Sequence, residues 1–330
     1  MRVKSLIFVL LMFAFASRAS AQLQYPPDTK NAALRYWVAF AEMKDIPTDK
    51  ATQDLLEKTL SAQALWDEKK IAPILDANKF AIDIMQRATK LPDCDWGLEY
   101  QQGASASIAY APRARALSRL NTLEGMRQLA AGNTQSATDT WLAGVRFSQD
   151  LARGGSLIFT LMAKNALLAN LRPLTLAAAN GQLTVAERQQ VTAAIRALPA
   201  DAFDWSAAWG LESATLDHSL HELQSASDPR GLYEQVMGSA APQKGLPPSA
   251  QDIHDFEAYM RAVQSALKES PEKSKASLEG LEAKRSALPE VEQQMIPNPQ
   301  KSNQARIDVA QARSELLQAL SKASTKSNGD

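Results

Sequence analysis

Apolar side chains recur at every third or fourth position along most of the chain, which is the pattern of amphipathic α-helices. The strict alternation typical of half-buried strands is almost absent. In the segment 31–43, for example, Leu34, Trp37, Val38 and Ala41 share one helical face. A narrower apolar seam, suited to packing against one other helix, consists of Ile253, Phe256, Met260, Val263 and Leu267.

Capping and helix-breaking residues set the bounds of the expected helices. Thr184 and Glu187 have the spacing of a capping box, and Pro173 is expected to break or kink the helix before it. The expected helices cover 31–43, 48–70, 73–90, 112–131, 134–153, 156–171, 201–226, 271–288 and 303–323, with others at the seam and after Thr184. The sequence therefore predicts an all-α fold of about ten antiparallel helices, in a bundle or short irregular α-solenoid without a substantial sheet.

One long segment lacks the helical period. It covers 91–111 (LPDCDWGLEYQQGASASIAYA) and contains Cys94, Trp96, Tyr100 and Tyr110. Loops of this length are uncommon inside compact domains, and they are often functional or packed across a groove. We therefore expect candidate site residues in this loop.

Changes of composition suggest how the chain is divided. The segment 227–249 is rich in Pro, Gly and Ser, which is typical of a hinge or linker. It separates a main helical domain (22–226) from C-terminal helices (250–324) that we expect to pack on that domain, and 325–330 is expected to be a disordered tail.

The first 21 residues have the pattern of an export signal. Arg2 and Lys4 precede the apolar run 6–16, which is too short to span a hydrocarbon core of about 30 Å. Small residues at Ala19 and Ala21 predict cleavage after Ala21. No later segment is long and apolar enough to span a membrane, so the sequence predicts a mature chain that is soluble after cleavage.

Charge and cysteine usage narrow the possible partners and the compartment. The 36 basic and 36 acidic residues balance and no basic block occurs, so nucleic acid is not an expected partner. Cys94 is the only cysteine, which rules out an intrachain disulfide, and no Asn-x-Ser/Thr glycosylation site is present. Export without either feature favours a bacterial periplasm or an extracellular bacterial location. Cys94 itself is interpreted as a small buried hydrophobe whose pKa is raised by Asp93 and Asp95.

Four aromatic residues are candidates for binding. Trp96, Tyr100, Trp205 and Trp209 offer flat rings that stack sugars or anchor peptides. The alternative is that Trp205 and Trp209, four residues apart, form a core stripe, and that Trp96 is the plug by which the loop docks.

Carboxylates supply a second set of candidates. Asp93, Asp95 and Glu99 lie in the loop, and Glu212 precedes a serine, as the general-acid glutamate of lytic transglycosylases does. The downstream Gly-Leu-Met-Gln element of those enzymes is missing here, which favours a surface glutamate. A glycosidase would need two acids facing each other at about 5 Å or about 6.5–9.5 Å.

Two further features combine charge with helical spacing. Lys164 interrupts the apolar helix 156–171, so it must pair with an acid, for instance in the 93–99 loop, or serve as a ligand-binding lysine. His218, His221 and Glu222 lie on one helical face and are weak metal-ligand candidates, with solvated helix surface as the alternative. No nucleotide, haem or other cofactor motif is present, so no cofactor is predicted.

Three segments resemble parts of known proteins: 31–43, the DCDWGLEY loop, and the run 113–173. Together they resemble a group of uncharacterised exported all-helical bacterial proteins of acidobacterial and planctomycete type, which implies an exported helical protein without naming a reaction. Gly132 to Thr134, leading into Ala137 and Trp141, also resembles the turn of a tetratricopeptide hairpin, although no 34-residue period recurs.

Two functional hypotheses follow. The first is a non-catalytic binding or scaffolding protein of the bacterial cell envelope, with an unknown protein or glycan partner and with the 91–111 loop at the edge of its binding surface. The alternative is an envelope glycan hydrolase or lyase that uses paired carboxylates.

Overall fold

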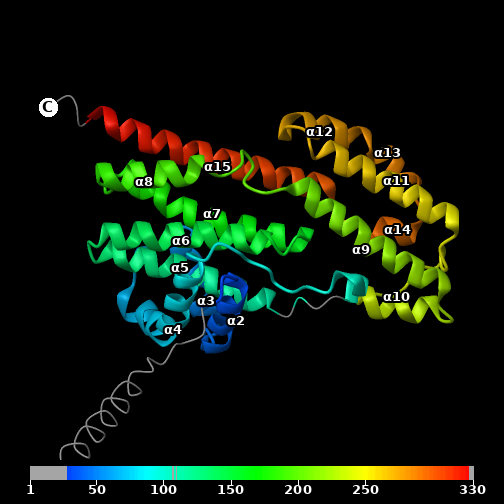
Figure 1. Cartoon of the computed structure of the whole chain (residues 1–330), viewed down its shortest axis with the longest axis horizontal. Helices are drawn as coiled ribbons and strands as arrows, with labels where there is room; N and C mark the ends of the chain where they lie inside the picture. Colours follow the sequence, from blue (N-terminus) through cyan, green and yellow to red (C-terminus); the bar gives the residue numbers. More distant parts are fainter. Residues whose placement is uncertain (1–27, 106–107, 109, 327–330) are drawn as a thin grey trace, which may run out of the picture. The chain divides into compact units, whose positions relative to one another are not determined.

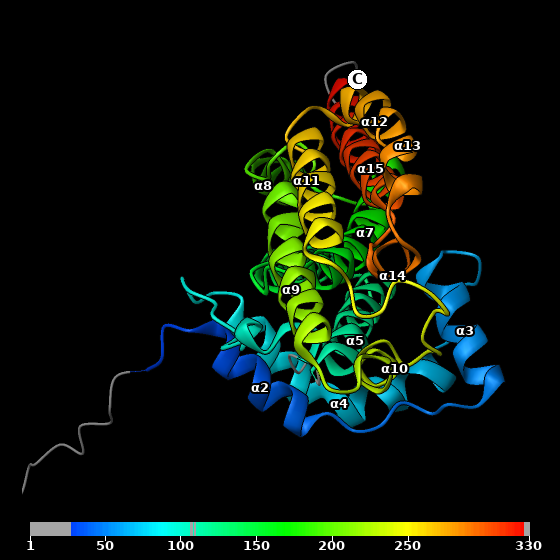
Figure 2. The same cartoon turned by 90° about the vertical axis from the view of Figure 1, so that its right-hand side faces the viewer.

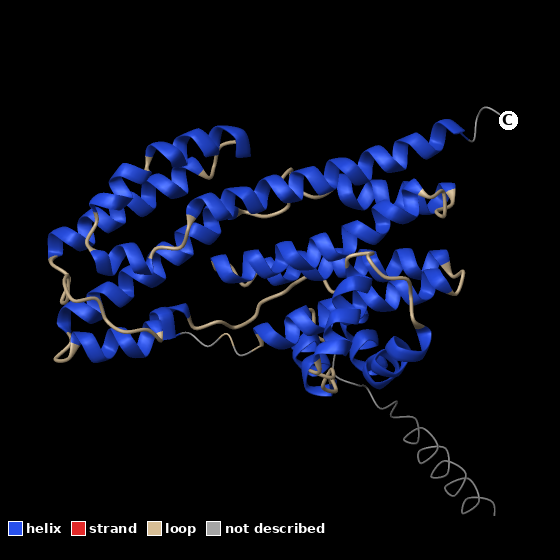
Figure 3. Ribbon diagram, turned by 180° about the vertical axis from the view of Figure 1, so that it is seen from behind, coloured by secondary structure: helices blue, strands red, loops and turns tan. Residues whose placement is uncertain are grey.

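The computed structural model describes residues 28–105, 108 and 110–326, and these residues are helical with connecting loops (Figure 3). They contain no strand, and the one β-bridge among them joins Asn31 to Asp93. The described residues from Asn31 onward form one compact unit. The all-α prediction is confirmed.

The helices fall into twelve of nine residues or more, two short ones of six residues (α13 and α14) and one 3-10 segment (η1) across the described residues. Their bounds are α2 (Ala32–Glu42), α3 (Lys50–Leu60), α4 (Glu68–Ala88), η1 (Tyr100–Ser105), α5 (Ala111–Ala130), α6 (Thr134–Ala152), α7 (Leu157–Ala179), α8 (Val185–Arg196), α9 (Trp205–Ser225), α10 (Pro229–Met237), α11 (Ala250–Ala266), α12 (Pro271–Gly280), α13 (Glu282–Ala287), α14 (Glu290–Met295) and α15 (Pro299–Lys326).

The centre of the unit is a row in which α5 packs on α6, α6 on α7 and α7 on α15 (Figure 1). Two glycines allow the close approach within this row. Gly125 of α5 faces the indole of Trp141, and Gly144 of α6 faces the amide of Asn170, so neither position has room for a Cβ atom. A larger residue at either glycine would push two helices apart.

Buried polar groups fix the register of these central helices. Asn121 donates to the carbonyl of Thr140 at 2.9 Å. The hydroxyl of Thr122 donates to the Asn170 carbonyl oxygen at 3.3 Å, and the Asn170 amide donates back to Ala166 at 2.8 Å. Since a buried polar group without a partner is costly, these contacts favour one alignment of α5, α6 and α7.

The helix α2 packs on α4, and its buried face is not the apolar face that the sequence indicates. Ala33, Tyr36 and Phe40 are buried. Leu34, Trp37 and Val38, which share a face as the sequence indicates, are 54%, 41% and 45% exposed. The helix therefore has two apolar faces, and tertiary packing covers only one of them.

A second group of helices packs around α9. The helix α11 runs alongside α9 (Figure 2), with the predicted seam buried between them. Arg306 of α15 is 3% exposed and joins this group to the rest. It donates to Asp201 at 2.7 Å, to Ser274 at 2.8 Å and to the carbonyl of Glu269 at 2.6 Å.

Several expected helix bounds are wrong. The helix expected over 48–70 ends at Leu60, because the chain turns at Ala62 with a φ of 58°. The next helix begins at Glu68 behind the cap Asp67, so Pro73 lies inside it. Pro173 is also inside a helix: α7 continues to Ala179, where packing against α6 and α15 compensates for the one hydrogen bond that proline removes.

Other differences concern the second half of the chain. Asp204, not Asp201, caps α9 by accepting from the Ala207 N–H at 2.8 Å. The segment 227–249 contains α10, whose Tyr233 is buried. The helix α14 is not anticipated by the sequence pattern, and α15 extends to Lys326, into the segment expected to be a disordered tail. Residues 1–27, which include the predicted export signal, lie outside the described residues.

Candidate functional site

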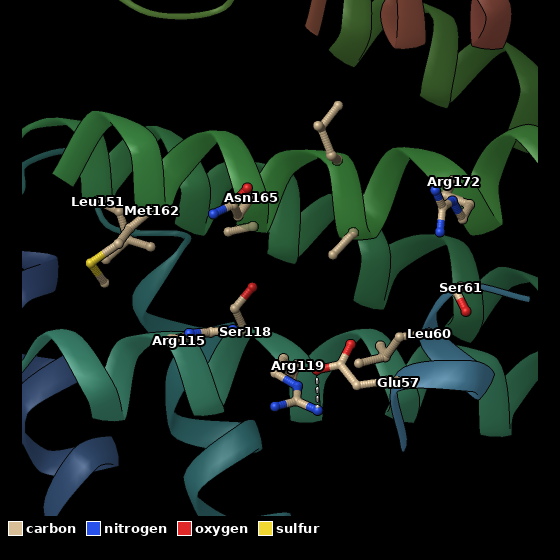
Figure 4. A pocket seen from close by; sticks show the side chains of 13 residues that line it. Glu57, Leu60, Ser61, Arg115, Ser118, Arg119, Leu151, Met162, Asn165 and Arg172 are labelled. Atoms are coloured by element: carbon tan, nitrogen blue, oxygen red, sulfur yellow. Dashed lines mark ion pairs between the residues drawn. The ribbon is translucent and has the colours of Figure 1, made fainter. Parts of the chain in front are cut away.

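A cavity of about 480 Å³ lies between α3, α5 and α7 (Figure 4). We call it the arginine cavity. Its volume is in the range of small-molecule sites. It is lined by Glu57, Leu60 and Ser61 at the end of α3, by Arg115, Ser118 and Arg119 of α5, by Leu151 of α6, and by Met162, Asn165, Ala166, Leu168, Ala169 and Arg172 of α7.

Helical spacing brings the polar residues together. Ser118 and Arg119 follow Arg115 by three and four positions on α5, so both lie near it on the helix surface. Asn165 and Arg172 are seven positions apart on α7 and share a face. The two sets border the same space, which therefore combines three guanidinium groups with one carboxylate, Glu57.

Arg119 is the most enclosed of the three arginines. Its side chain is 21% exposed, and its Nη2 lies 3.0 Å from Oε1 of Glu57, whose side chain is 60% exposed. The contact is an ion pair without hydrogen-bond geometry: the buried Nε and Nη2 of Arg119 have no hydrogen-bond partner in the described part of the chain. A buried donor without a partner is unfavourable, and an oxyanion ligand would satisfy it.

Ser118 adds a second unpaired polar group. The residue is 4% exposed, and its Oγ has no hydrogen-bond partner among the described residues. Figure 4 shows the hydroxyl directed from α5 toward α7, into the cavity. Two adjacent residues of α5, both lining the cavity, thus have buried polar atoms without hydrogen-bond partners among the described residues.

Apolar side chains make up much of the remaining lining, and we call Leu151, Met162 and Ala166 its apolar floor. Leu151 and Ala166 are 1% and 5% exposed, and Met162 is partly buried. Arg172 also borders a hollow of about 380 Å³ between α7 and α15, which carries Asp308 and Glu315. The positive end of the cavity is therefore at Arg115 and Arg119.

The sequence-predicted loop residues lie elsewhere and form an anchor around Asp150. Asp150 of α6 is fully buried, and its backbone carbonyl accepts from Nε1 of Trp96 at 2.8 Å. The Trp96 ring, 5% exposed, stacks on Tyr110 with centroids 4.5 Å apart. Trp96 is therefore buried as the plug by which the loop docks.

Burial makes the ionisable groups at this anchor costly to ionise. Burial, and then the charge of Asp150, raises the pKa of the Cys94 thiol to about 12. The direction agrees with the prediction, although burial rather than Asp93 and Asp95 is the first cause. Burial also raises the pKa of Asp150, against the opposing effects of Tyr36, Arg146 and Arg153.

The side chains of Asp93 and Asp95 are exposed, and their backbone carbonyls accept hydrogen bonds from residues at the start of α2. The carbonyl of Asp93 accepts from the Ala32 N–H at 2.7 Å, and the carbonyl of Asp95 accepts from the Asn31 amide at 2.9 Å. Both contacts fasten the loop to the start of α2. The arginine cavity contains neither of these acids, nor Glu99 or Glu212.

Tyr100 and Glu212 meet at the start of α7. Burial raises the pKa of Tyr100, opposed by Ser156, and the nearby Glu212 raises it further. Burial also raises the pKa of Glu212, opposed by the backbone N–H of Leu157. Glu212 is thus a half-buried residue, not the exposed one that the sequence favours.

The other candidates occupy separate places. Trp205 and Trp209 are 1% and 0% exposed and lie in the core. Lys164 pairs with Asp308 of α15, with Nζ and Oδ2 3.0 Å apart, and not with the 93–99 loop. Burial raises the pKa of Asp308, but hydrogen bonds from Gln304 and Lys164 outweigh it and hold that pKa below its ordinary value.

The histidines lie on an exposed part of α9. Nε2 of His218 is 3.5 Å from Glu222, and Nδ1 of His221 is 3.5 Å from Asp217. Within the described residues, no three His, Cys, Asp or Glu side chains are arranged to hold a metal ion.

Sequence reasoning missed the arginine cavity. The available signal was the interruption of the apolar helix at Asn165, seven positions before Arg172, together with the arginines at 115 and 119.

None of the described helices combines the length and apolar character that crossing a membrane requires. No known protein family, curated protein sequence or solved structure matches this chain.

Proposed function

We propose that this protein is a non-catalytic helical binding protein of the bacterial cell envelope, and that it holds a small molecule in the arginine cavity. One observation carries the proposal: Arg119 and Ser118, which have buried donors without hydrogen-bond partners among the described residues, line a cavity of about 480 Å³ together with apolar side chains. An apolar pocket with a few convergent polar groups is the usual form of a ligand site.

The lining favours binding over chemistry. Activation of Ser118 as a nucleophile requires an adjacent base, and its hydroxyl has no hydrogen-bond partner among the described residues. The one carboxylate of the cavity, Glu57, is paired with Arg119. The alternative, a glycan hydrolase or lyase, would use Asp93, Asp95, Glu99 or Glu212, which lie outside this cavity.

The cell-envelope part of the proposal rests on the sequence. Arg2 and Lys4, the apolar run 6–16 and the small residues Ala19 and Ala21 have the order of a bacterial export signal. The absence of paired cysteines fits a periplasmic protein that needs no disulfide. Cell fractionation of the tagged full chain, with sequencing of its mature amino terminus, tests this part.

Filling the cavity tests the binding function. Ala169 of α7 lines the arginine cavity, and Ala193 of α8 lines a hollow of almost equal size, about 470 Å³, between α8 and α15. We expect the wild-type protein to bind at least one of two fluorescent probes, the neutral N-phenyl-1-naphthylamine or the anionic anilinonaphthalene sulfonate. Ala169→Trp should abolish that binding, and Ala193→Trp should leave it unchanged.

Near-ultraviolet circular dichroism establishes that both variants keep the native fold. Failure of the folded wild type to bind either probe would contradict the proposal. Equal binding by wild type and a folded Ala169→Trp variant would contradict it as well.

A further inference from the structure

We infer that the ligand of the arginine cavity is an amphipathic oxyanion, a carboxylate or phosphate head on an apolar tail, and that its head replaces Glu57 at Arg119. This inference rests on the proposed binding function and specifies the ligand class of the same site. It follows from three features of the cavity: the geometry at Arg119, the balance of charge, and the apolar floor.

The unpaired hydrogen-bond donors of Arg119 indicate the head group of the ligand. A guanidinium presents Nε and Nη2 as a planar fork that matches two oxygens of one carboxylate or phosphate. Oε1 of Glu57 lies 3.0 Å from Nη2, and neither Nε nor Nη2 has a hydrogen-bond partner in the part of the chain that is described. A ligand oxyanion in the fork would satisfy both donors at once.

The charge of the residues that line the cavity favours a ligand with an anionic head over one with a neutral or cationic head. Three arginines border the cavity, and Glu57 is its one acidic residue. Arg115 and Arg172 have no ion pair within the described residues. A cation would be repelled by these groups, and a neutral head would leave the Arg119 fork unpaired.

The apolar floor of the cavity indicates the tail of the ligand. Leu151 and Ala166 are buried, Met162 is partly buried, and all three line the cavity. Methionine adapts its shape to different apolar groups, so this surface suits a flexible alkyl or aryl tail better than a sugar. Leu60 of α3 adds an apolar contact at the opposite wall.

Glu57 acts as an internal competitor for the head-group position. Its side chain is 60% exposed, and such ion pairs are weak because water screens them. It comes from α3, whose buried side chains are Leu56 and Thr59. Removing the carboxylate of Glu57 should therefore make the fork of Arg119 available and increase the affinity for an oxyanion.

Titration calorimetry with four eight-carbon probes tests the inference on the full mature chain. The probes are octanoate, octyl phosphate, 1-octanol and octylammonium, each below its micellar concentration. We expect octanoate or octyl phosphate to bind at least tenfold more tightly than the alcohol and the ammonium. The ratio between the two anions decides whether the head is a carboxylate or a phosphate.

Variants connect the binding to the named residues. Arg119→Gln should weaken anion binding at least tenfold, and Glu57→Gln should strengthen it about threefold or more. Arg196→Gln, in the hollow between α8 and α15, is the matched control and should change nothing. Arg119→Lys keeps the charge without the fork and should show intermediate affinity, which covers the case in which Arg119→Gln does not fold.

The outcomes separate the two proposals. If 1-octanol binds as tightly as the anions, or if neither anion binds, the ligand class is wrong. Unchanged anion affinity in a folded Arg119→Gln variant, or weaker affinity in Glu57→Gln, overturns the assignment of the head-group position. The binding function itself stands or falls with the dye titration of Ala169→Trp, which does not depend on the charge of the ligand.

Discussion

The hydroxyl of Tyr36 donates a 2.6 Å hydrogen bond to Oδ2 of Asp150, joining α2 to α6 across 114 positions of sequence. Both residues are fully buried. The same Asp150 accepts from Trp96 through its backbone, so one residue of α6 holds both the first described helix and the 91–111 loop. The contact organises the α2 side of the fold and is distinct from the arginine cavity.

Removing the hydroxyl of Tyr36, whose acceptor is the carboxyl group of Asp150, should destabilise the protein more than removing a tyrosine hydroxyl whose acceptor is neutral. Tyr36→Phe leaves a buried carboxylate without its donor, and we expect a loss of about 2–3 kcal/mol in the free energy of unfolding. Tyr233→Phe, whose hydroxyl donates to Gln294 at 2.8 Å, is the control and should lose about 1 kcal/mol. Urea denaturation measures both, and equal losses would contradict the role assigned to Asp150.

Trp96 should behave as a core residue and not as a partner anchor. Its ring is buried between Tyr36, Phe40 and Tyr110, so Trp96→Ala should cost about 3–5 kcal/mol of stability. Trp37, which contacts Tyr110 but is 41% exposed, supplies the matched control. Trp37→Ala should cost less than half as much in urea denaturation. A Trp96→Ala variant with wild-type stability would show that the loop docks without its indole.

The Cys94 thiol should be unreactive in the native protein. It is 8% exposed, and burial raises its pKa to about 12, so little thiolate forms at pH 8. We expect iodoacetamide at pH 8 to modify the native protein about a hundredfold or more slowly than the urea-unfolded chain. Mass spectrometry over time gives both rates. Comparable rates in the two states would show that the thiol is accessible.

Glu292 should make stability fall as pH rises. The residue is fully buried, its two carboxyl oxygens have no partner in the described structure, and burial raises its pKa from 4.5 to about 7. Between these values the folded state keeps a proton that the unfolded state releases, so stability decreases from about pH 4.5 through about pH 7. The total effect is at most about 3 kcal/mol.

Glu292→Gln removes this contribution, so its stability relative to the wild type should rise between pH 5 and pH 8. The exposed Glu290 lies two positions away, and Glu290→Gln should show no such trend. Urea denaturation at several pH values measures the difference. A constant difference across that range would mean that Glu292 is ionised in the fold throughout.

The fold class followed from periodicity because apolar spacing identifies helices directly. Which face of a helix is buried did not always follow. The helix α2 carries Leu34, Trp37 and Val38 on one side and Tyr36 and Phe40 on another, and only contact with α4 and the loop selects the second. Pro173 likewise stays within α7 because of its neighbours, which no local rule describes.

The candidate site could be predicted from the sequence even less well than the buried faces of the helices. Trp96 and Cys94 stood out because they lie in a long loop. The structure buries both and docks the loop through Trp96, which the sequence offered as the alternative to a binding role. The arginine cavity joins residues 57–61, 115–119 and 162–172, and ordinary surface patterning hides such a set until tertiary packing brings it together. The interruption of an apolar helix at Asn165 was the one local sign.

A crystal structure with 8-bromooctanoate tests the central claim most directly, because anomalous scattering locates the bromine and hence the tail. We expect the carboxylate at Nε and Nη2 of Arg119, the side chain of Glu57 displaced toward solvent, and the bromine in the cavity beside Met162. A fully occupied ligand elsewhere on the protein, with Glu57 still paired to Arg119 at saturating concentration, would contradict the account.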